Sequence, residues 1–329
     1  MKQRKLGQNG PMVSAVSYGA MSFTDFYGPA DDAQSARVLD ACVDLGITHL
    51  DTANVYGMGR SETVIGDWLK QRRGANPFRI ATKVGITRDP EFRFNNAADH
   101  LAAELDGSLR RLGVEVIDLY YIHRWDRRHE IEVVADVLAG FVKAGKVRAV
   151  GYSEIAPSTV RRAHAVHPVA AVQSEYSLST RAPELGLVQT CAEIGATLVA
   201  FSPVGRSLLT DRPHSYESAQ TMGFLKQNPR FMDPHLTANL AYNARFRALA
   251  ADIGVPAATL AIAWVLHQGE HVMAIPGTRH IDHLQELVQG GEMDLSPDEI
   301  RRIEEVLPVG WAHGDRYSQV QWDGPERYS

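Results

Sequence analysis

The sequence predicts a single (β/α)8 barrel. Short runs rich in valine, isoleucine and leucine alternate along the chain with longer stretches of helical period. The runs are continuously apolar, which is typical of parallel strands that are buried on both faces. The length of 329 residues suits one barrel with long loops, and no linker divides the chain. Residues 1–329 are therefore expected to form one domain.

The strands can be assigned in order. Asn9-Gly10-Pro11 is a turn signal between two weak apolar runs and predicts a short N-terminal hairpin. A doubly wound sheet is the alternative fold, but it requires G-x-G-x-x-G after its first strand, and Gly19-Ala20-Met21-Ser22 lacks that pattern. The eight predicted barrel strands are Val16–Gly19, His49–Thr52, Ile80–Lys83, Ile117–His123, Val147–Ser153, Ala171–Glu175, Thr197–Ser202 and Val272–Gly277.

The stretches between the strands predict helices. Gly46 and Gly113 fit the position just after a helix, and Ser61 with Glu62 fits a helix start. The segment from Pro203 to about Leu236 breaks the alternation, and a loop of that length in a compact barrel is usually functional. The predicted helices are Ala33–Leu45, Ser61–Gln71, Ala97–Leu112, Ile131–Ala144, Pro157–Ala165, Glu184–Ile194, a pair within Leu240–His267, and about Ser296–Leu307.

The composition excludes several classes of protein. Hydrophobic residues make up 44% and charged residues 22%, which argues against disorder. The net charge of −5 provides no basic field for nucleic acid. Neither a signal peptide nor an uncharged apolar stretch of roughly 18 residues is present, so a cytoplasmic protein without a membrane partner is expected. Cys42 and Cys191 lie in apolar helical patterns and are expected to be buried thiols rather than a disulfide or metal pair.

Polar residues end the second, third and fourth predicted strands. These residues are Asp51, Lys83 and His123, and Tyr56 lies in the loop after the second strand. Chemistry in this fold takes place at the C-terminal ends of strands. A lysine ammonium beside a phenol favours the phenolate, so the tyrosine can exchange a proton with a developing alkoxide, while a neutral histidine hydrogen-bonds the same oxygen. This set suits carbonyl reduction, and the missing hydride source implies a nicotinamide cofactor.

Other interpretations of the four residues remain open at this point. Asp51 and Lys83 alone could form a structural ion pair, His123 could be a core histidine, and Tyr56 could be a surface residue. A metal-dependent hydrolase would require clustered ligands, but the strand ends offer one histidine, so no metal site is expected. A Schiff-base lyase would require a lowered pKa at its lysine, whereas an adjacent Asp51 raises the pKa of Lys83.

From about Arg4 to Val306, the sequence resembles the aldo-keto reductase family. The matching motifs are "GITHLDTANVYG", "LRRLGVEVIDLYYIHR" (Leu109–Arg124) and "LAIAWVLHQGEHVMAIPGTR" (Leu260–Arg279). The resemblance implies a (β/α)8 barrel that binds NADP(H) without a Rossmann motif. It also implies a catalytic tetrad of Asp51, Tyr56, Lys83 and His123. The implied activity is reversible reduction of a small aldehyde or ketone, with hydride from the nicotinamide C4 and a proton from Tyr56. Some relatives are instead cofactor-bound regulatory subunits of ion channels with little turnover, and that is the alternative function.

The resemblance also implies a set of cofactor contacts. Gln173 would bond the nicotinamide carboxamide and Phe201 would stack on its ring. Arg206 would pair with the pyrophosphate, and Arg279 at the 2′-phosphate would favour NADPH, with NAD(H) as a possible substitute. Glu154 and Leu287 stand where Asn is common, and His283 stands where Gln or Arg is common. The full set is Ala20, Met21, Asp51, Ser153, Glu154, Gln173, Phe201, Ser202, Pro203, Val204, Gly205, Arg206, Gly277, Arg279, His283 and Glu286.

Substrate contacts are expected from loops over the barrel mouth. The candidates are Phe23, Phe26, Tyr27, Tyr56, His123 and Trp125. The C-terminal tail, residues 308–329, is aromatic and polar, and it either lines the pocket or packs on the barrel. An aromatic lining would favour a hydrophobic aldehyde or ketone. Gly57 and Gly59 are expected to give the loop that carries Tyr56 its flexibility.

Overall fold

The N-terminal hairpin closes one end of the barrel. The computed structural model describes residues 1–87, 89 and 92–328. Strands β1 (Gln3–Lys5) and β2 (Met12–Ser14) pair antiparallel, as predicted. Leu6 and Val13 from the hairpin are buried in one cluster with barrel residues, including Val199 and Met273. The hairpin therefore plugs the end of the barrel opposite to the C-terminal ends of the strands.

Eight parallel strands form the barrel in chain order. Each strand pairs with the next one along the chain, which confirms the predicted topology. A parallel bridge joins Val16 to Ala274, and the N–H of Ser17 donates to the carbonyl of Ala274 at 2.8 Å, so the first and last strands meet. The strands are β3 (Tyr18–Gly19), β4 (His49–Asp51), β5 (Arg79–Val84), β6 (Leu119–Ile122), β7 (Val150–Ser153), β8 (Val169–Glu175), β9 (Thr197–Phe201) and β10 (Val272–Ala274).

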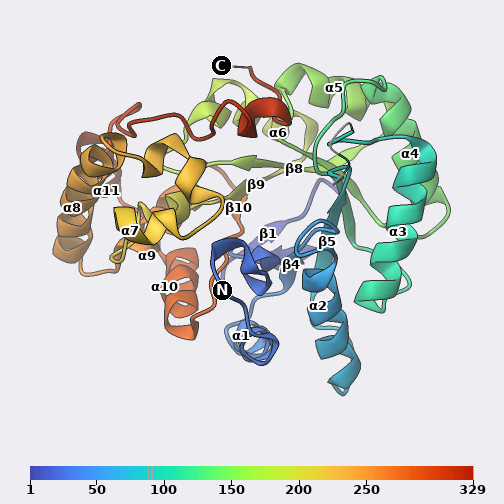
Figure 1. Cartoon of the computed structure of the whole chain (residues 1–329), viewed down its shortest axis with the longest axis horizontal. Coiled ribbons are helices and arrows are strands. Elements are labelled where there is room, and N and C mark those ends of the chain that lie inside the picture. The colour runs from blue at the N-terminus through green and yellow to red at the C-terminus, as the bar shows by residue number, and fades with distance from the viewer. Residues whose placement is uncertain (88, 90–91, 329) are drawn as a thin grey trace.

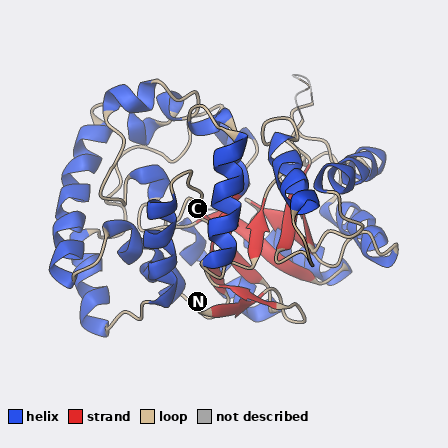
Figure 2. Cartoon of the chain, turned by 90° about the horizontal axis from the view of Figure 1, so that it is seen from below, coloured by secondary structure: helices blue, strands red, loops and turns tan. Residues whose placement is uncertain are grey.

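Helices surround the strands (Figures 1 and 2). No single helix among the described residues is long and apolar enough to cross a membrane; only α8 and α9 together, bent by 88°, reach that length and composition. The helices are α1 (Asp32–Asp44), α2 (Arg60–Gln71), α3 (Ala98–Leu112), α4 (Ile131–Lys143), α5 (Pro157–Val166), α6 (Leu187–Ile194), α7 (Tyr216–Gln220), α8 (His235–Ile253), α9 (Ala257–His267), α10 (Ile281–Glu292) and α11 (Pro297–Val306).

Three of the helices differ from the prediction, and one of them, α7, lies in the segment that was expected to be a loop. The predicted Glu184–Ile194 helix is divided at Gly186, whose φ of 135° ends a 3-10 turn before α6 begins. Helix α10 was not predicted, although its apolar residues recur at helical spacing. Gly290 near its end lets α10 approach α9, because a Cβ atom there would come within 2.6 Å of the carbonyl of Thr259.

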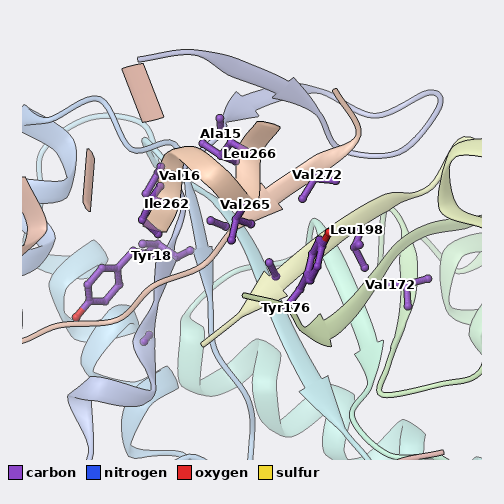
Figure 3. Packing of buried hydrophobic residues seen from close by; sticks show 14 of the residues in the cluster. Ala15, Val16, Tyr18, Val172, Tyr176, Leu198, Ile262, Val265, Leu266 and Val272 are labelled. Atoms are coloured by element: carbon purple, nitrogen blue, oxygen red, sulfur yellow. The ribbon is translucent and has the colours of Figure 1, made fainter. Parts of the chain in front are cut away.

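The main hydrophobic core lies between the strands and the helices. Ala15 and Val16, which precede β3, and Tyr18 of β3 pack near Ile262 and other residues of α9 (Figure 3). Burial of such side chains is worth about 1.5–3 kcal/mol each relative to exposure. The cysteine prediction is also confirmed, because Cys42 and Cys191 are buried and unpaired.

The long segment after β9 is folded. It contains short 3-10 turns and α7, and its side chains form a separate cluster of Leu208, Ala219, Leu225, Phe231 and Leu236. Asn243 of α8 donates to the carbonyls of Leu208 at 2.9 Å and Thr210 at 3.0 Å. These contacts fix the loop over the mouth of the barrel.

The C-terminal tail runs from α11 to the start of α5 (Figure 1). Near one end, the indole N–H of Trp311 donates to the carbonyl of Leu178 at 2.8 Å. Near the other, the carboxylate of Glu326 accepts from the N–H of Ala156 and the hydroxyl of Thr159, both at 2.7 Å. The tail is thus attached to the barrel at both ends.

Candidate active site

Adjacent parallel strands bring Asp51, Lys83 and His123 together. Asp51 is the last residue of β4, Lys83 lies in β5, and His123 directly follows β6. Lys83 is fully buried, and its ammonium donates to a carboxylate oxygen of Asp51 and to the carbonyl of Thr52 at 2.8 Å. Its third contact is the phenol oxygen of Tyr56 at 3.3 Å. The sequence-predicted residues therefore form one connected group.

The loop after β4 places Tyr56 by its backbone conformation. Gly57 and Gly59 have left-handed φ values of 58° and 87°. A Cβ atom at Gly57 would come within 2.9 Å of the Thr24 side chain, and one at Gly59 within 2.6 Å of the Arg111 side chain. The two glycines are needed for this conformation and close packing, rather than for the flexibility that the sequence suggested.

The imidazole of His123 stands edge-on to the ring of Tyr56. Their ring centroids are 5.7 Å apart at an interplanar angle of 81°. Nδ1 of His123 is buried without a hydrogen-bond partner among the described residues. Burial lowers the pKa of His123 well below its ordinary value, and the charges of Arg124 and Lys83 lower it further. His123 is therefore neutral at physiological pH.

The ion pair beneath Tyr56 keeps Lys83 charged. Burial alone would lower the pKa of Lys83, but the neighbouring Asp51 and Tyr56 outweigh burial and raise it. Burial raises the pKa of Asp51, and this shift is opposed by Lys83 and by Gln173, whose side-chain N–H donates to Asp51 at 2.7 Å. The carboxylate of Asp51 thus balances the charge of Lys83.

A cavity of about 940 Å³ opens above these residues. Residues from the loop after β9, from the segment after β10 and from the tail line it together with the tetrad residues Asp51, Tyr56 and His123. The other predicted site residues that line it are Met21, Phe26, Tyr27, Ser153, Gln173, Phe201, Ser202, Pro203, Val204, Arg206, Gly277, Arg279, His283 and Glu286.

Six predicted site residues do not line the cavity, and the fully buried Lys83 is one of them. Phe23 is fully buried and stacks on Tyr18, with ring centroids 5.2 Å apart. The indole of Trp125 instead donates to the carbonyl of His129 at 2.8 Å and packs against the main core. The other three, Ala20, Gly205 and Glu154, are also buried.

Glu154 belongs to a buried group of charges that we call the arginine–glutamate cluster: Glu154, Glu175, Arg206, Arg230 and Arg316. Glu154 pairs with Arg316 of the tail and accepts from the N–H of Glu175 at 2.8 Å. Arg206, expected at the pyrophosphate, donates both terminal nitrogens to Glu175, at 2.9 and 2.7 Å. Its charge is therefore already balanced by a carboxylate, although its side chain lines the cavity.

The charges of the cluster shift one another's pKa values. Burial opposes ionisation of Glu175, but Arg206, Arg316 and Arg230 outweigh burial and lower its pKa to about 2. Burial lowers the pKa of Arg230 to about 10. The cluster joins β8, the long loop and the tail beside the cavity.

The far end of the cavity is basic. Arg279 donates to the carbonyls of Tyr27 at 2.6 Å and Gly28 at 2.7 Å. The rings of His280 and His283 lie 4.9 Å apart, and His283 also contacts Arg212. These residues line the cavity together with Glu286 and Leu287.

Several lining residues were not predicted. Arg124 directly follows His123, so the strand-end rule that found His123 could also have identified it. Arg212 and Phe224 come from the long loop, where no periodic pattern indicates which side chains face the cavity. The described residues contain no group of three or more potential metal ligands.

Comparison with known proteins agrees with this arrangement. The family model described as "Aldo/keto reductase family" matches residues 15–308. The chain belongs to the aldo/keto reductase family. It is 35% identical to "Aldo-keto reductase yakc [NADP(+)]" of Schizosaccharomyces pombe over 320 residues, covering 95% of this chain and 94% of that protein. It is 39% identical to "Probable aldo-keto reductase 1" of Glycine max over 316 residues, covering 95% and 91%.

Solved structures of aldo-keto reductases show the same barrel. A glycerol dehydrogenase from Gluconobacter oxydans superposes with a TM-score of 0.81 at 28% identity, over 93% of this chain and 94% of that chain. An aldo-keto reductase from Bacillus halodurans superposes with a TM-score of 0.78 at 25% identity, over 98% and 99%.

This aldo-keto reductase should lose stability in mild acid because of His49. His49 is fully buried in β4, and neither ring nitrogen has a partner among the described residues. Burial, with a smaller effect from Lys83, lowers its pKa to about 3. Unfolded histidine binds a proton below about pH 6.5, so acid favours the unfolded state, by about 2 kcal/mol at pH 5 for this residue.

Urea unfolding at pH 7.5 and pH 5 tests this expectation. His49→Leu should make the free energy of unfolding less dependent on pH by about that amount, while His267→Gln, at an exposed position, should not. Equal pH dependence in wild type and His49→Leu would show that His49 does not cause the loss.

Proposed function

We propose that the protein is an NADPH-dependent reductase that converts an aldehyde or ketone to an alcohol, reversibly. The observation that carries the proposal is the position of the Tyr56 phenol. It lines the cavity 3.3 Å from the buried ammonium of Lys83 and beside the neutral imidazole of His123. Carbonyl reduction requires a proton donor, and here the phenol contacts a buried cation and lies beside an imidazole that can hydrogen-bond the same oxygen.

The cavity fits an extended nicotinamide cofactor. One end holds Gln173 and Phe201 next to the tetrad, and the other holds Arg279, His280 and His283, which suit a phosphate. The other predicted cofactor contacts that line the cavity include Ser153, Gly277, Glu286 and residues 202–204. The 2′-phosphate would compete with the loop carbonyls for the guanidinium of Arg279. The NADP(+) in the name of the Schizosaccharomyces pombe relative also supports this cofactor.

When bound, NADPH would supply the hydride. Tyr56 would donate its proton to the substrate oxygen, and Lys83 would stabilise the phenolate that remains. Asp51 would hold Lys83 and balance its charge. His123, neutral because it is buried, would hydrogen-bond the carbonyl oxygen and orient it. In alcohol oxidation the same groups act in reverse.

The C-terminal tail forms part of the cavity wall. The tail residues that line the cavity are Tyr317, Gln321, Gly324 and Pro325, and this supports a substrate pocket that is completed by the tail. The two unpaired, buried cysteines suit a reducing compartment, which supports a cytoplasmic location.

The test is cofactor consumption with a panel of aldehydes and ketones, run with NADPH and with NADH. We expect rapid NADPH consumption with at least one carbonyl compound and slower turnover with NADH, because Arg279 and its neighbours favour the additional phosphate. Tight NADPH binding without turnover, together with a stable complex with another protein, would instead favour a regulatory subunit.

A further inference from the structure

We propose that the substrate carries a carboxylate and that Arg124 binds it. This inference rests on the proposed carbonyl reduction and adds the chemical class of the substrate. Arg124 is the residue next to His123 and lines the same cavity. A carbonyl group held between Tyr56 and His123 would therefore have a guanidinium close to the remainder of the molecule.

The guanidinium of Arg124 is fixed in place by the protein. Its Nη1 donates to the carbonyl of His123 at 2.6 Å and to the hydroxyl of Ser153 at 3.1 Å. The tail packs on its aliphatic part, because a Cβ atom at Gly324 would lie 2.9 Å from Cδ of Arg124. A guanidinium held this way loses little conformational entropy when it binds a carboxylate.

Arg124 also retains unused binding capacity. A guanidinium has five N–H donors, and those on Nε and Nη2 of Arg124 have no protein acceptor among the described residues. Among the residues that the structure describes, no carboxylate oxygen lies within 4 Å of the Arg124 side-chain nitrogens. The charge of Arg124 helps to lower the pKa of Glu154, but that carboxylate is buried and already paired with Arg316.

Three other arginines near Arg124, in contrast, are each paired with a carboxylate. Arg93 pairs with Asp323 at 3.2 Å, and Arg128 pairs with Asp126 at 3.6 Å. Arg206 is paired with Glu175. Arg124 thus supplies a positive charge beside the proposed reacting group. No carboxylate of the described residues contacts this charge, so a substrate carboxylate would neutralise it.

The surrounding wall limits what connects the two groups. Ile86 and Phe94 line the cavity together with Arg124. Their apolar side chains suit an aromatic or hydrocarbon spacer between the carbonyl and the carboxylate. 4-Carboxybenzaldehyde and its methyl ester are therefore suitable probes, because the ester keeps the aldehyde and the aromatic ring and removes the negative charge.

The experiment compares kcat/KM for the acid and the ester in the full chain with NADPH. We expect the wild type to prefer the acid, and Arg124→Gln to lower the acid-to-ester ratio by a factor of about 10 to 100, mainly through KM for the acid. Arg128→Gln removes the same charge from an exposed position outside the cavity lining and should leave the ratio unchanged.

Two outcomes would overturn the proposal. One is a wild type that does not prefer the acid, and the other is an equal acid-to-ester ratio in wild type and Arg124→Gln. If this equal ratio comes from an equal loss on both substrates with weaker NADPH binding, Arg124 acts only through Ser153.

If neither aldehyde is reduced, the result counts against the proposed carbonyl reduction, and a second measurement is needed for the carboxylate site. Calorimetric titration with benzoate, in the presence of NADP+, still tests the carboxylate site. Binding that weakens about 10-fold or more in Arg124→Gln supports the site, and binding independent of Arg124 or no binding overturns it.

Discussion

Tyr56→Phe is expected to lower kcat by about 10²- to 10⁴-fold, which is the contribution of a positioned general acid. The change removes the phenol oxygen that Lys83 contacts at 3.3 Å and leaves the ring beside His123. NADPH consumption in the presence of a carbonyl substrate measures the loss. NADPH affinity, measured by fluorescence titration, should stay close to that of the wild type, because the phenol is not among the proposed cofactor contacts.

Tyr120→Phe is the matched control for this variant. Tyr120 lies in β6, is fully buried, and its hydroxyl has no hydrogen-bond partner among the described residues. Removing that hydroxyl should leave turnover unchanged. Wild-type turnover in Tyr56→Phe would exclude Tyr56 as the proton donor.

Glu175→Gln should produce the largest loss of stability. Glu175 is fully buried and accepts both terminal nitrogens of Arg206, while Arg316 and Arg230 lie at 3.5 and 3.8 Å. Removing its charge leaves these guanidinium groups without their shared partner, and breaking a buried pair costs about 3–5 kcal/mol. The free energy of unfolding in urea at pH 7 measures the effect.

The pH dependence gives an independent measure of the same interaction. Because the pKa of Glu175 is lowered to about 2 from an ordinary 4.5, its contribution is present above pH 4.5 and is lost as the pH falls towards 2. This shift corresponds to about 3 kcal/mol, in the range expected from breaking the pair. Glu175→Gln should lose this component of acid sensitivity.

Glu132→Gln provides the control for a carboxylate-to-amide change. Glu132 pairs with Arg162 on the surface, where solvent screens the charges, so its removal should leave the unfolding curve close to that of the wild type. Proteolysis of the tail should become faster in Glu175→Gln only, because Arg316 loses one of its two acidic neighbours. Equal stability of Glu175→Gln and wild type would show that the cluster does not stabilise the fold.

The barrel and the residues around Tyr56 could be predicted from sequence because both follow from local rules. Apolar runs locate the strands, and parallel pairing brings the ends of neighbouring strands together. Asp51, Lys83 and His123 therefore lie close to one another, although no sequence motif specifies which of them are in contact. Their assigned roles remain proposals. Helix α10 is not among the predicted helices, although its apolar residues recur at helical spacing.

The arginine–glutamate cluster could not be predicted in the same way. Glu154 and Arg316 are 162 residues apart in sequence, and no periodic pattern connects a strand end with an irregular tail. Arg206 was expected at a phosphate because of its loop, whereas its partner Glu175 lies at the end of another strand. Sequence rules indicated which polar side chains reach the mouth of the barrel, but not which of them neutralise one another.

The attachment of the tail has a consequence for synthesis of the chain. Glu154 and Glu175 are made roughly midway through translation, whereas Arg316 follows only after every barrel strand and α11 have been made. A nascent chain with all eight strands therefore still holds Glu154 without its guanidinium partner, beside a cavity that lacks the tail part of its wall. Because Arg316 and the tail part of the wall are made last, the pairing of Glu154 with Arg316 and the completion of the cavity both depend on the end of synthesis.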